Sequence, residues 1–151
     1  MRQEPDCALL RHAPLRHERG VFCHRFRVRY AELDPQGVVF NARYLDYADL
    51  VLTEQWRAAG ILAGQADPFE CHVVKALVDY RKPIRIDEEI DGLIRVAAFG
   101  TTSMTSLIAL HGAGADDLRA SIEIVHVHVD LATGQPCPIP QTVRDAFAAL
   151  A

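Results

Sequence analysis

The chain has 151 residues, of which 50% are hydrophobic and 24% are charged, and its formal net charge is −4 at pH 7. This length suits one domain with its own core, and the composition is too apolar for a disordered chain. A domain that binds nucleic acid is normally basic, so the acidic balance argues against nucleic acid as a partner.

The N-terminal segment MRQEPDCALLRHAPLRHERG is polar and shows no helix or strand periodicity. We therefore expect residues 1–20 to form a flexible N-terminal arm and residues 21–151 to form a single domain. The arm has no apolar core of signal-peptide length, and its acidic residues argue against an organellar transit peptide. No later segment is long and apolar enough to cross a membrane, so we expect a cytoplasmic protein without membrane contact.

The four cysteines lie far apart in the sequence, at Cys7, Cys23, Cys71 and Cys137. The chain has no Cys-x-x-Cys pair that would support a zinc ribbon or a thioredoxin-type site. Free thiols in a reducing cytoplasm are therefore the expected state of these residues.

A strand is predicted directly after the arm, in FCHRFRVRYAE. Apolar and polar residues alternate there, which indicates a strand with one buried face. Arg25, Arg27 and Arg29 share the opposite face, where solvent exposure is a commoner explanation than phosphate binding. The predicted buried face carries Phe22, His24, Phe26, Val28 and Tyr30.

A turn and a long helix follow this strand. Pro35 and Gly37 mark the turn, and Asn41 is a candidate for the helix N-cap. Between residues 43 and 59, polar side chains recur at three- and four-residue steps in a narrow stripe, so we expect a mostly buried helix. Gly60 ends the helix, whose length would be about 25 Å. The polar stripe consists of Arg43, Asp46, Asp49, Thr53 and Arg57.

Four further strands are predicted, in CHVVKALVDYRKP, EEIDGLIRVAAFG, TTSMTSLIALHG and LRASIEIVHVHVD. A turn-rich exit, DLATGQPCPIP, leads to a short C-terminal helix, QTVRDAFAAL. Short connections favour antiparallel neighbours, and the long helix is the only substantial cover for the apolar face of the sheet. The predicted fold is therefore α+β, with a five-stranded antiparallel sheet wrapped around one long central helix.

This order of elements resembles the hotdog fold. The segment LDPQGVVFNARYLDYADLVLTEQWRAAG resembles the signature of the 4-hydroxybenzoyl-CoA thioesterase family of acyl-CoA thioesterases, and the resemblance extends over residues 22–150. The chain departs from the family pattern at Glu32, where Asp is commoner, and at Asn41, where His or Tyr is common. The matching positions are Tyr30, Glu32, Asp34, Gly37, Val38, Val39, Phe40, Asn41 and Tyr44.

The resemblance implies that Asp34 is the catalytic carboxylate of a thioester hydrolase. Hydrolysis needs one carboxylate, to attack the carbonyl carbon or to activate water, and one donor for the developing oxyanion. A thiol with a pKa near ~8.5 leaves readily, so no strong general acid is required. We expect the unpaired backbone N–H of Asn41, at the positive end of the helix, to polarise the carbonyl. The alternative is that Asp34 only caps the turn.

Further residues are candidates for substrate binding. By resemblance, Asp49 matches a position that faces the acyl pocket. A second hotdog lineage places its catalytic carboxylate on this helix, so Asp46, Asp49 and Glu54 are rivals of Asp34, and the alternative is that they belong to the polar stripe or reach a partner subunit. Lys82, Arg85 and Ser103 flank the expected entrance, where they would hold the phosphates of CoA, and ordinary solvent exposure is the alternative. The complete predicted substrate-binding set is Gly37, Val38, Tyr44, Asp49, Lys82, Arg85 and Ser103.

His126 and His128 share one face of the last predicted strand, at a spacing that can begin a metal site. The sequence places no convincing third ligand beside them, so sheet packing or subunit contact is the expected role. We expect no metal and no other cofactor, because CoA is part of the substrate.

An exposed edge strand invites pairing with a second chain, so we expect a homodimer joined edge to edge, and the resemblance also implies homotetramers. The site would then lie between subunits. The alternatives to an acyl-CoA thioesterase are an acyl-carrier-protein thioesterase, a hotdog dehydratase and a non-catalytic acyl-CoA-binding hotdog protein. The dehydratase would need an Asp–His hydratase motif, which the sequence lacks.

Overall fold

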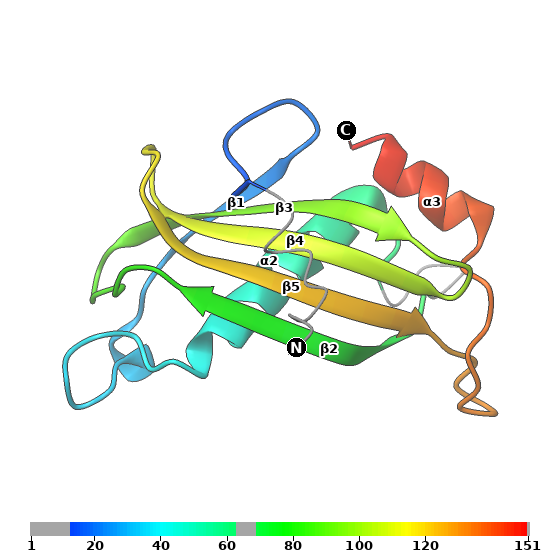
Figure 1. Cartoon of the computed structure of the whole chain (residues 1–151), viewed down its shortest axis with the longest axis horizontal. Coiled ribbons are helices and arrows are strands. Elements are labelled where there is room, and N and C mark those ends of the chain that lie inside the picture. Colours follow the sequence, from blue (N-terminus) through cyan, green and yellow to red (C-terminus); the bar gives the residue numbers. More distant parts are fainter. Residues whose placement is uncertain (1–12, 63–68, 151) are drawn as a thin grey trace, which may run out of the picture.

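The computed structural model describes residues 13–62 and 69–150, and Figure 1 shows the course of the chain. Within these ranges, one five-stranded sheet is accompanied by two α-helices and a short 3₁₀ turn. No helix in these ranges is long and apolar enough to cross a membrane. In chain order, the elements are β1 (Phe22–Arg27), the 3₁₀ turn (Tyr30–Glu32), α2 (Arg43–Ala59), β2 (Cys71–Tyr80), β3 (Glu89–Phe99), β4 (Ser103–Gly112), β5 (Leu118–His128) and α3 (Gln141–Ala148).

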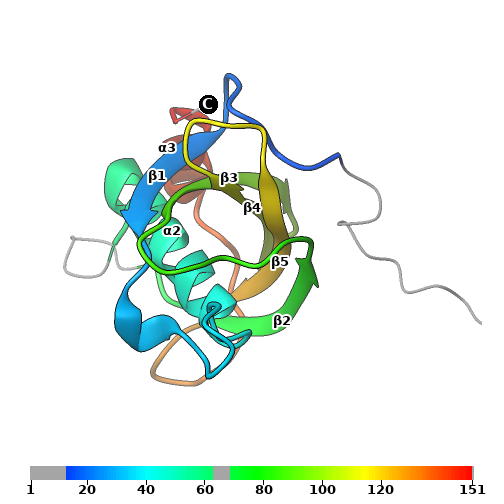
Figure 2. The ribbon, with the colours of Figure 1, turned by 90° about the vertical axis from the view of Figure 1, so that its left-hand side faces the viewer.

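All neighbouring strands are antiparallel, and their order across the sheet is β1-β3-β4-β5-β2. Seen end-on in Figure 2, the sheet curls around α2, which lies in its hollow. The apolar cluster between sheet and helix includes Val51, Ile94, Ile108 and Ile122. The predicted α+β architecture, a five-stranded antiparallel sheet around one central helix, is confirmed.

Helix α2 spans the residues predicted from its polar stripe, Arg43–Ala59. It ends at Gly60, whose left-handed backbone (φ 75°) directs its N–H to carbonyl groups of the last helical turn. The start differs from the prediction, because the N-cap is Ala42 rather than Asn41 and no side chain caps it. Asn41 instead belongs to the preceding turn, where its carbonyl oxygen accepts the N–H of Tyr44 at 3.3 Å. The N-terminus of α2 therefore keeps backbone donors that no side chain covers.

Strand β1 is shorter than the sequence alternation predicts. Its inward-facing residues are half-buried as expected. Tyr30, predicted on the same buried face, is instead 82% exposed. The prediction for Tyr30 is wrong because the chain leaves the sheet after β1 and turns through the 3₁₀ segment toward the start of α2.

Helix α2 passes β3 at close range above Gly92. A Cβ atom at Gly92 would lie 2.1 Å from Cγ2 of Val51, a fully buried side chain of the helix. Two carbon atoms cannot approach so closely in a packed interior, so the absence of a side chain at Gly92 lets the helix lie at this distance from the sheet.

We expect Gly92→Ala to lower the free energy of unfolding by about 1–3 kcal/mol, because the added methyl group overpacks the interface. Val51→Ala removes the methyl groups in conflict, so it should cost less in the Gly92→Ala background than in the wild type. Urea unfolding of both single variants and the double variant measures this coupling. Simple additivity of the two costs would contradict the close approach.

Part of the predicted arm lies against the outer face of the sheet. Leu15 is buried in a second apolar cluster with Leu93, Leu107 and Ala109, on the face opposite to α2. Its carbonyl oxygen lies 2.8 Å from Nε2 of His111, whose side chain is also buried. The arm is therefore attached to the domain at Leu15, while its residues 1–12 lie outside the described residues.

Candidate active site

The turn between the 3₁₀ segment and α2 carries Asp34. The N–H of Asp34 donates to the carbonyl oxygen of Val38 at 2.8 Å, and the N–H of Gly37 donates to the carbonyl oxygen of Asp34 at 3.0 Å. Gly37 has a φ of 76°, a conformation that side chains disfavour. The carboxylate oxygen Oδ1 of Asp34 accepts the N–H of Gln36 at 2.8 Å. This turn-forming bond orients the carboxylate, and within the described residues no donor reaches its second oxygen.

Glu32 holds this turn against the helix. Its buried carboxylate accepts the hydroxyl of Tyr47 at 2.7 Å, and it accepts both the backbone N–H and Nε of Arg29 at 2.8 Å. Burial raises the pKa of Glu32, but these donors outweigh it and hold the pKa below its usual value. The carbonyl oxygen of Glu32 accepts the N–H of Phe40 at 2.9 Å. Glu32 is therefore a positioning residue for the turn, a role that the sequence could not show because Tyr47 is distant in the chain.

A cleft of about 350 Å³ opens beside this turn, the N-terminal end of α2 and the segment that follows β2. Several of the predicted site residues line it, although they come from segments far apart in the sequence. They are Asp34, Val38, Asn41, Tyr44 and Lys82. The candidate carboxylate and the candidate donor segment therefore meet in one place.

The backbone of Asn41 offers a hydrogen-bond donor at this cleft. Its N–H donates to no acceptor among the residues that the structure describes. Its carbonyl oxygen accepts the hydroxyl of Tyr80 at 3.0 Å, and Tyr80 packs edge-on against Tyr44 with ring centroids 4.9 Å apart. The donor lies at the positive end of α2, where an oxyanion is stabilised. Tyr80 was not among the predicted site residues, because its only sequence signal is an aromatic residue at the end of a strand.

Four other predicted site residues lie outside the lining of the cleft, namely Gly37, Arg85, Asp49 and Ser103. Gly37 shapes the turn, and Arg85 faces Val38 across an isolated antiparallel bridge. Asp49 is exposed on α2. Burial lowers the pKa of His126, and the negative charge of Asp49 opposes this effect without cancelling it. Within one chain, Asp49 therefore lies outside the cleft that Asp34 lines.

Ser103 is not brought to the cleft. It begins β4 and pairs with Val127 near the end of β5, whereas Tyr80 at the cleft pairs with Ala120 near the start of β5. Most of the length of the sheet separates these two positions. Within one chain, Ser103 and the cleft residues therefore do not share a site. The sequence pattern could not show this, because it does not reveal which end of each strand lies near the turn with Asp34.

The two histidines of the last strand are packed among aromatic rings. His126 is buried, its ring lies 5.7 Å from that of Trp56, and burial lowers its pKa. His128 lies 5.0 Å from the ring of Phe69, and its Nδ1 lies 2.8 Å from the carbonyl oxygen of Glu70. These contacts agree with the packing role that the sequence favoured.

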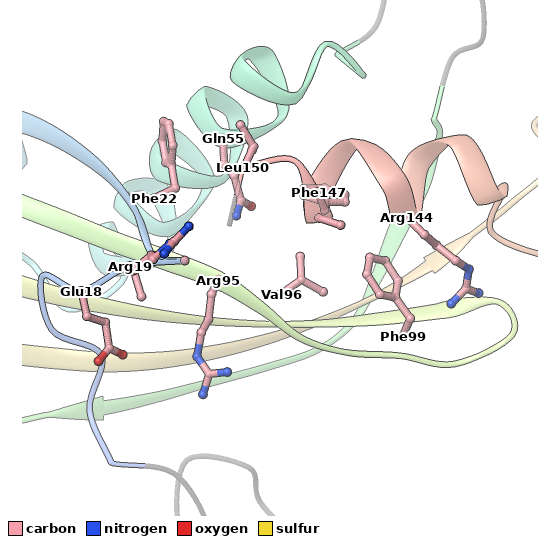
Figure 3. A pocket seen from close by; sticks show the side chains of 13 residues that line it. Glu18, Arg19, Phe22, Gln55, Arg95, Val96, Phe99, Arg144, Phe147 and Leu150 are labelled. Atoms are coloured by element: carbon pink, nitrogen blue, oxygen red, sulfur yellow. The ribbon is translucent and has the colours of Figure 1, made fainter.

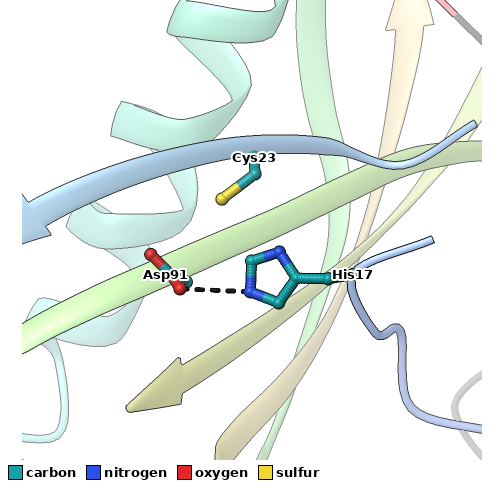
Figure 4. Close-up of side chains that lie close together, drawn as sticks. All are labelled: His17, Cys23 and Asp91. Carbon is teal, nitrogen blue, oxygen red and sulfur yellow. Dashed lines mark hydrogen bonds and ion pairs between the residues drawn. The ribbon is translucent and has the colours of Figure 1, made fainter. Parts of the chain in front are cut away.

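One cluster of candidate metal ligands occurs in the described part of the chain, where ligand atoms of His17, Cys23 and Asp91 lie within 4.8 Å of one another (Figure 4). Asp91 is fully buried, and its oxygens accept Nε and Nη2 of Arg25 at 2.6 and 2.9 Å. Nε2 of His17 and the N–H of Gly114 lie 3.1 and 2.8 Å from Oδ2. Protein donors thus engage both oxygens of Asp91, and the cluster is an ion-pair network that ties the segment before β1 to the sheet.

Acid should weaken this network. Despite burial, the bonds from Arg25 and the N–H of Gly114 hold the pKa of Asp91 at about 2, below its ordinary value of 3.8. Because the folded state lowers the pKa of Asp91, the ionised carboxylate stabilises the folded protein at pH values above the ordinary pKa. This contribution of about 2 kcal/mol is lost as the pH falls toward the folded-state pKa.

We therefore expect Asp91→Asn to be less stable than the wild type at neutral pH and to flatten the acid limb of the stability curve. Urea unfolding at a series of acidic pH values measures this slope. Asp46→Asn is the matched control, because this exposed carboxylate pairs with an exposed cation, Arg43, at 2.9 Å. An acid limb with the wild-type slope in Asp91→Asn would contradict the assignment.

A family model of the thioesterase-like superfamily matches residues 28–147 of the chain. The matched segment contains the turn with Asp34, all of α2 and strands β2 to β5. Among curated proteins, none matches the chain.

Solved structures share the fold. The PA5185 protein of Pseudomonas aeruginosa strain PAO1 is 30% identical, with a TM-score of 0.78 over 85% of this chain and 90% of that chain. A Thermus thermophilus thioesterase complexed with coenzyme A and Zn is 27% identical, with a TM-score of 0.77 over 89% of this chain and 96% of its own. A 1,4-dihydroxy-2-naphthoyl-CoA thioesterase from Synechocystis is 18% identical, with a TM-score of 0.77 over 86% of this chain and 97% of that chain. The likeness confirms the predicted hotdog fold.

Proposed function

The chain belongs to the thioesterase-like superfamily and is a thioester hydrolase, and we propose that it hydrolyses an acyl-CoA to a carboxylic acid and free CoA. The observation that carries this proposal is the cleft that Asp34, Asn41, Tyr44 and Lys82 line together. The Thermus thermophilus neighbour complexed with coenzyme A supports the same substrate class.

In the proposed mechanism, the N–H of Asn41 donates to the thioester carbonyl oxygen and stabilises the negative charge that develops there. The carboxylate of Asp34 either attacks the carbonyl carbon or takes a proton from a water molecule that attacks it. The C–S bond then breaks, and CoA leaves as a thiolate that takes up a proton. An anhydride formed by direct attack would be hydrolysed by water in a second step. No metal or other cofactor is required.

We propose that the cleft holds CoA through cations at its rim. Lys82 lines the cleft and pairs with Asp117 at 2.7 Å, and Arg85 is exposed opposite Val38. Pairs between exposed charges contribute little to stability, so Lys82 can exchange its carboxylate partner for a phosphate at small cost. Gly37, Val38 and Tyr44 would contact the part of the substrate nearest the thioester.

The exposed edge of β2 supports a homodimer as the active form. Among the described strands, β2 pairs only with β5. It presents Val73 and Val74 with 58% and 60% of their surface exposed. A second copy that pairs along this edge would join the two sheets and cover these side chains. Because Tyr80 ends β2 and lines the cleft, such a dimer would place the site beside the partner. Two such dimers would associate to form a tetramer.

A cytoplasmic location stays a prediction.

The test is a thiol-release assay on the purified protein with acyl-CoAs of varied length, both aliphatic and aromatic. We expect rapid release from at least one acyl class, because the cleft supplies both the carboxylate and the donor. Parallel assays on acyl-carrier proteins distinguish the two kinds of carrier. Tight binding of acyl-CoA without release of thiol would instead identify a non-catalytic acyl-CoA-binding protein.

A further inference from the structure

A second cavity, of about 550 Å³, lies where the segment before β1 meets β3 and α3 (Figure 3). Strand β1 pairs with β3 only as far as Ile94, so the following residues of β3 have no strand beside them on that edge within the described part of the chain. None of the residues that line this cavity lines the cleft with Asp34. Along α2, Gln55 at the cavity lies roughly 16 Å from Tyr44 at the cleft.

One wall of the cavity is apolar and largely aromatic. The rings of Phe99 and Phe147 lie 6.0 Å apart, and the guanidinium of Arg144 lies 5.0 Å from the centre of the Phe99 ring. Arg144 is already engaged, because its Nη2 donates to the carbonyl oxygen of Gly100 at 2.6 Å. A cavity of this size and lining suits a small molecule with an apolar body. The apolar wall is formed by Phe22, Val96, Phe99, Phe147 and Leu150.

Polar side chains in this cavity have unused hydrogen-bonding capacity. Gln55 is 4% exposed and projects from α2 into the cavity (Figure 3), and its Oε1 has no hydrogen-bond partner. The exposed Arg19 lines the cavity from the other wall, and Arg95 is a second cation of the lining. Within the described residues, no hydrogen bond or ion pair engages either guanidinium. A buried acceptor without a partner destabilises the fold, so its retention favours a ligand that supplies a donor.

We propose that this cavity binds an aromatic carboxylate that carries a hydroxyl group. The ring packs against the apolar wall, the hydroxyl donates to Oε1 of Gln55, and the carboxylate accepts from the guanidinium of Arg19. Each of these contacts corresponds to one observed feature of the lining: the aromatic wall, the buried acceptor and one of its two unengaged cations. The site is separate from the cleft and does not depend on its chemistry.

Isothermal titration calorimetry with hydroxyphenylpropionate tests this site. Phenylpropionate lacks the hydroxyl and should bind about tenfold more weakly, and hydroxyphenylpropanol lacks the charge and should lose at least as much affinity. Gln55→Leu should remove the preference for the hydroxyl, and Arg19→Gln should remove the preference for the carboxylate. Arg16→Gln is the matched control, because Arg16 lies in the same segment outside the cavity lining.

Thermal unfolding separates a ligand-binding role of Gln55 from a structural one. Gln55→Leu should melt at or above the wild-type temperature, because it removes an unsatisfied buried acceptor. Asp34→Asn should leave the affinity unchanged, and Arg19→Gln should leave thioester turnover unchanged. The proposal is overturned if no binding is detected at millimolar hydroxyphenylpropionate, or if the Asp34 and Lys82 variants rather than the Arg19 variant lower the affinity. In either case the thioesterase assignment would stand.

Discussion

Asp34→Asn should abolish nearly all thioester hydrolysis and leave the fold intact. Asn keeps the shape of the side chain and an oxygen that can still accept the N–H of Gln36, so the turn should persist. It removes the negative charge that attacks the carbonyl or activates water, a contribution of about 10²–10⁴ in rate. The measurement is kcat/KM from thiol release, with circular dichroism and the melting temperature to verify folding.

Asp130 provides a matched control for this experiment. Its Oδ1 accepts the N–H of Ala132 at 2.8 Å, the same bond to the second following residue that Asp34 makes, in an exposed turn. Asp130→Asn should therefore keep full activity. If Asp34→Asn retains near-normal turnover, Asp34 is only a turn former. If Asp34→Ala melts lower than Asp34→Asn, the turn-forming bond contributes to stability independently of the chemistry.

Lysine at both Val73 and Val74 should convert the protein to monomers. In an edge-to-edge dimer the strand of the partner would cover these side chains, so the four added charges would be costly to bury. Light scattering after size exclusion measures the mass. The rate of turnover should fall with the fraction of dimer. Tyr80 ends the same strand and lines the cleft, so the proposed dimer places the site beside the partner.

Leu131→Lys is the control for the edge experiment. Leu131 is 64% exposed in a turn outside the sheet, so it also adds a charge in place of an exposed apolar residue without touching β2. It should change neither mass nor activity. A dimer that survives both lysines on β2 would show that the copies meet through another surface.

Local periodicity was sufficient to predict the central helix. The polar stripe of α2 repeats over several turns, so its span, Arg43–Ala59, and the stop at Gly60 are determined by the local sequence. The four later strands were predicted for the same reason, because each alternates or is bounded by Gly or Pro. Boundaries depend on single hydrogen bonds, and at this level the N-cap prediction for Asn41 failed.

The site was only partly predictable, because its geometry depends on contacts between distant segments. The family signature indicated Asp34 and Asn41, and the structure brings both to one cleft. The roles of Glu32 and Tyr80 depend on bonds to Tyr47 and to the Asn41 carbonyl, which no local pattern encodes.

The contact of Leu15 with the outer face of the sheet limits how copies of this chain can assemble. The apolar patch of Leu93, Leu107 and Ala109 is satisfied by the chain's own N-terminal segment, so a second sheet cannot stack on that patch without displacing it. If copies pair along the edge of β2 as proposed, larger assemblies would have to form through another surface. A chain shortened past Leu15 would expose this apolar patch to solvent, so its sheets should associate face to face.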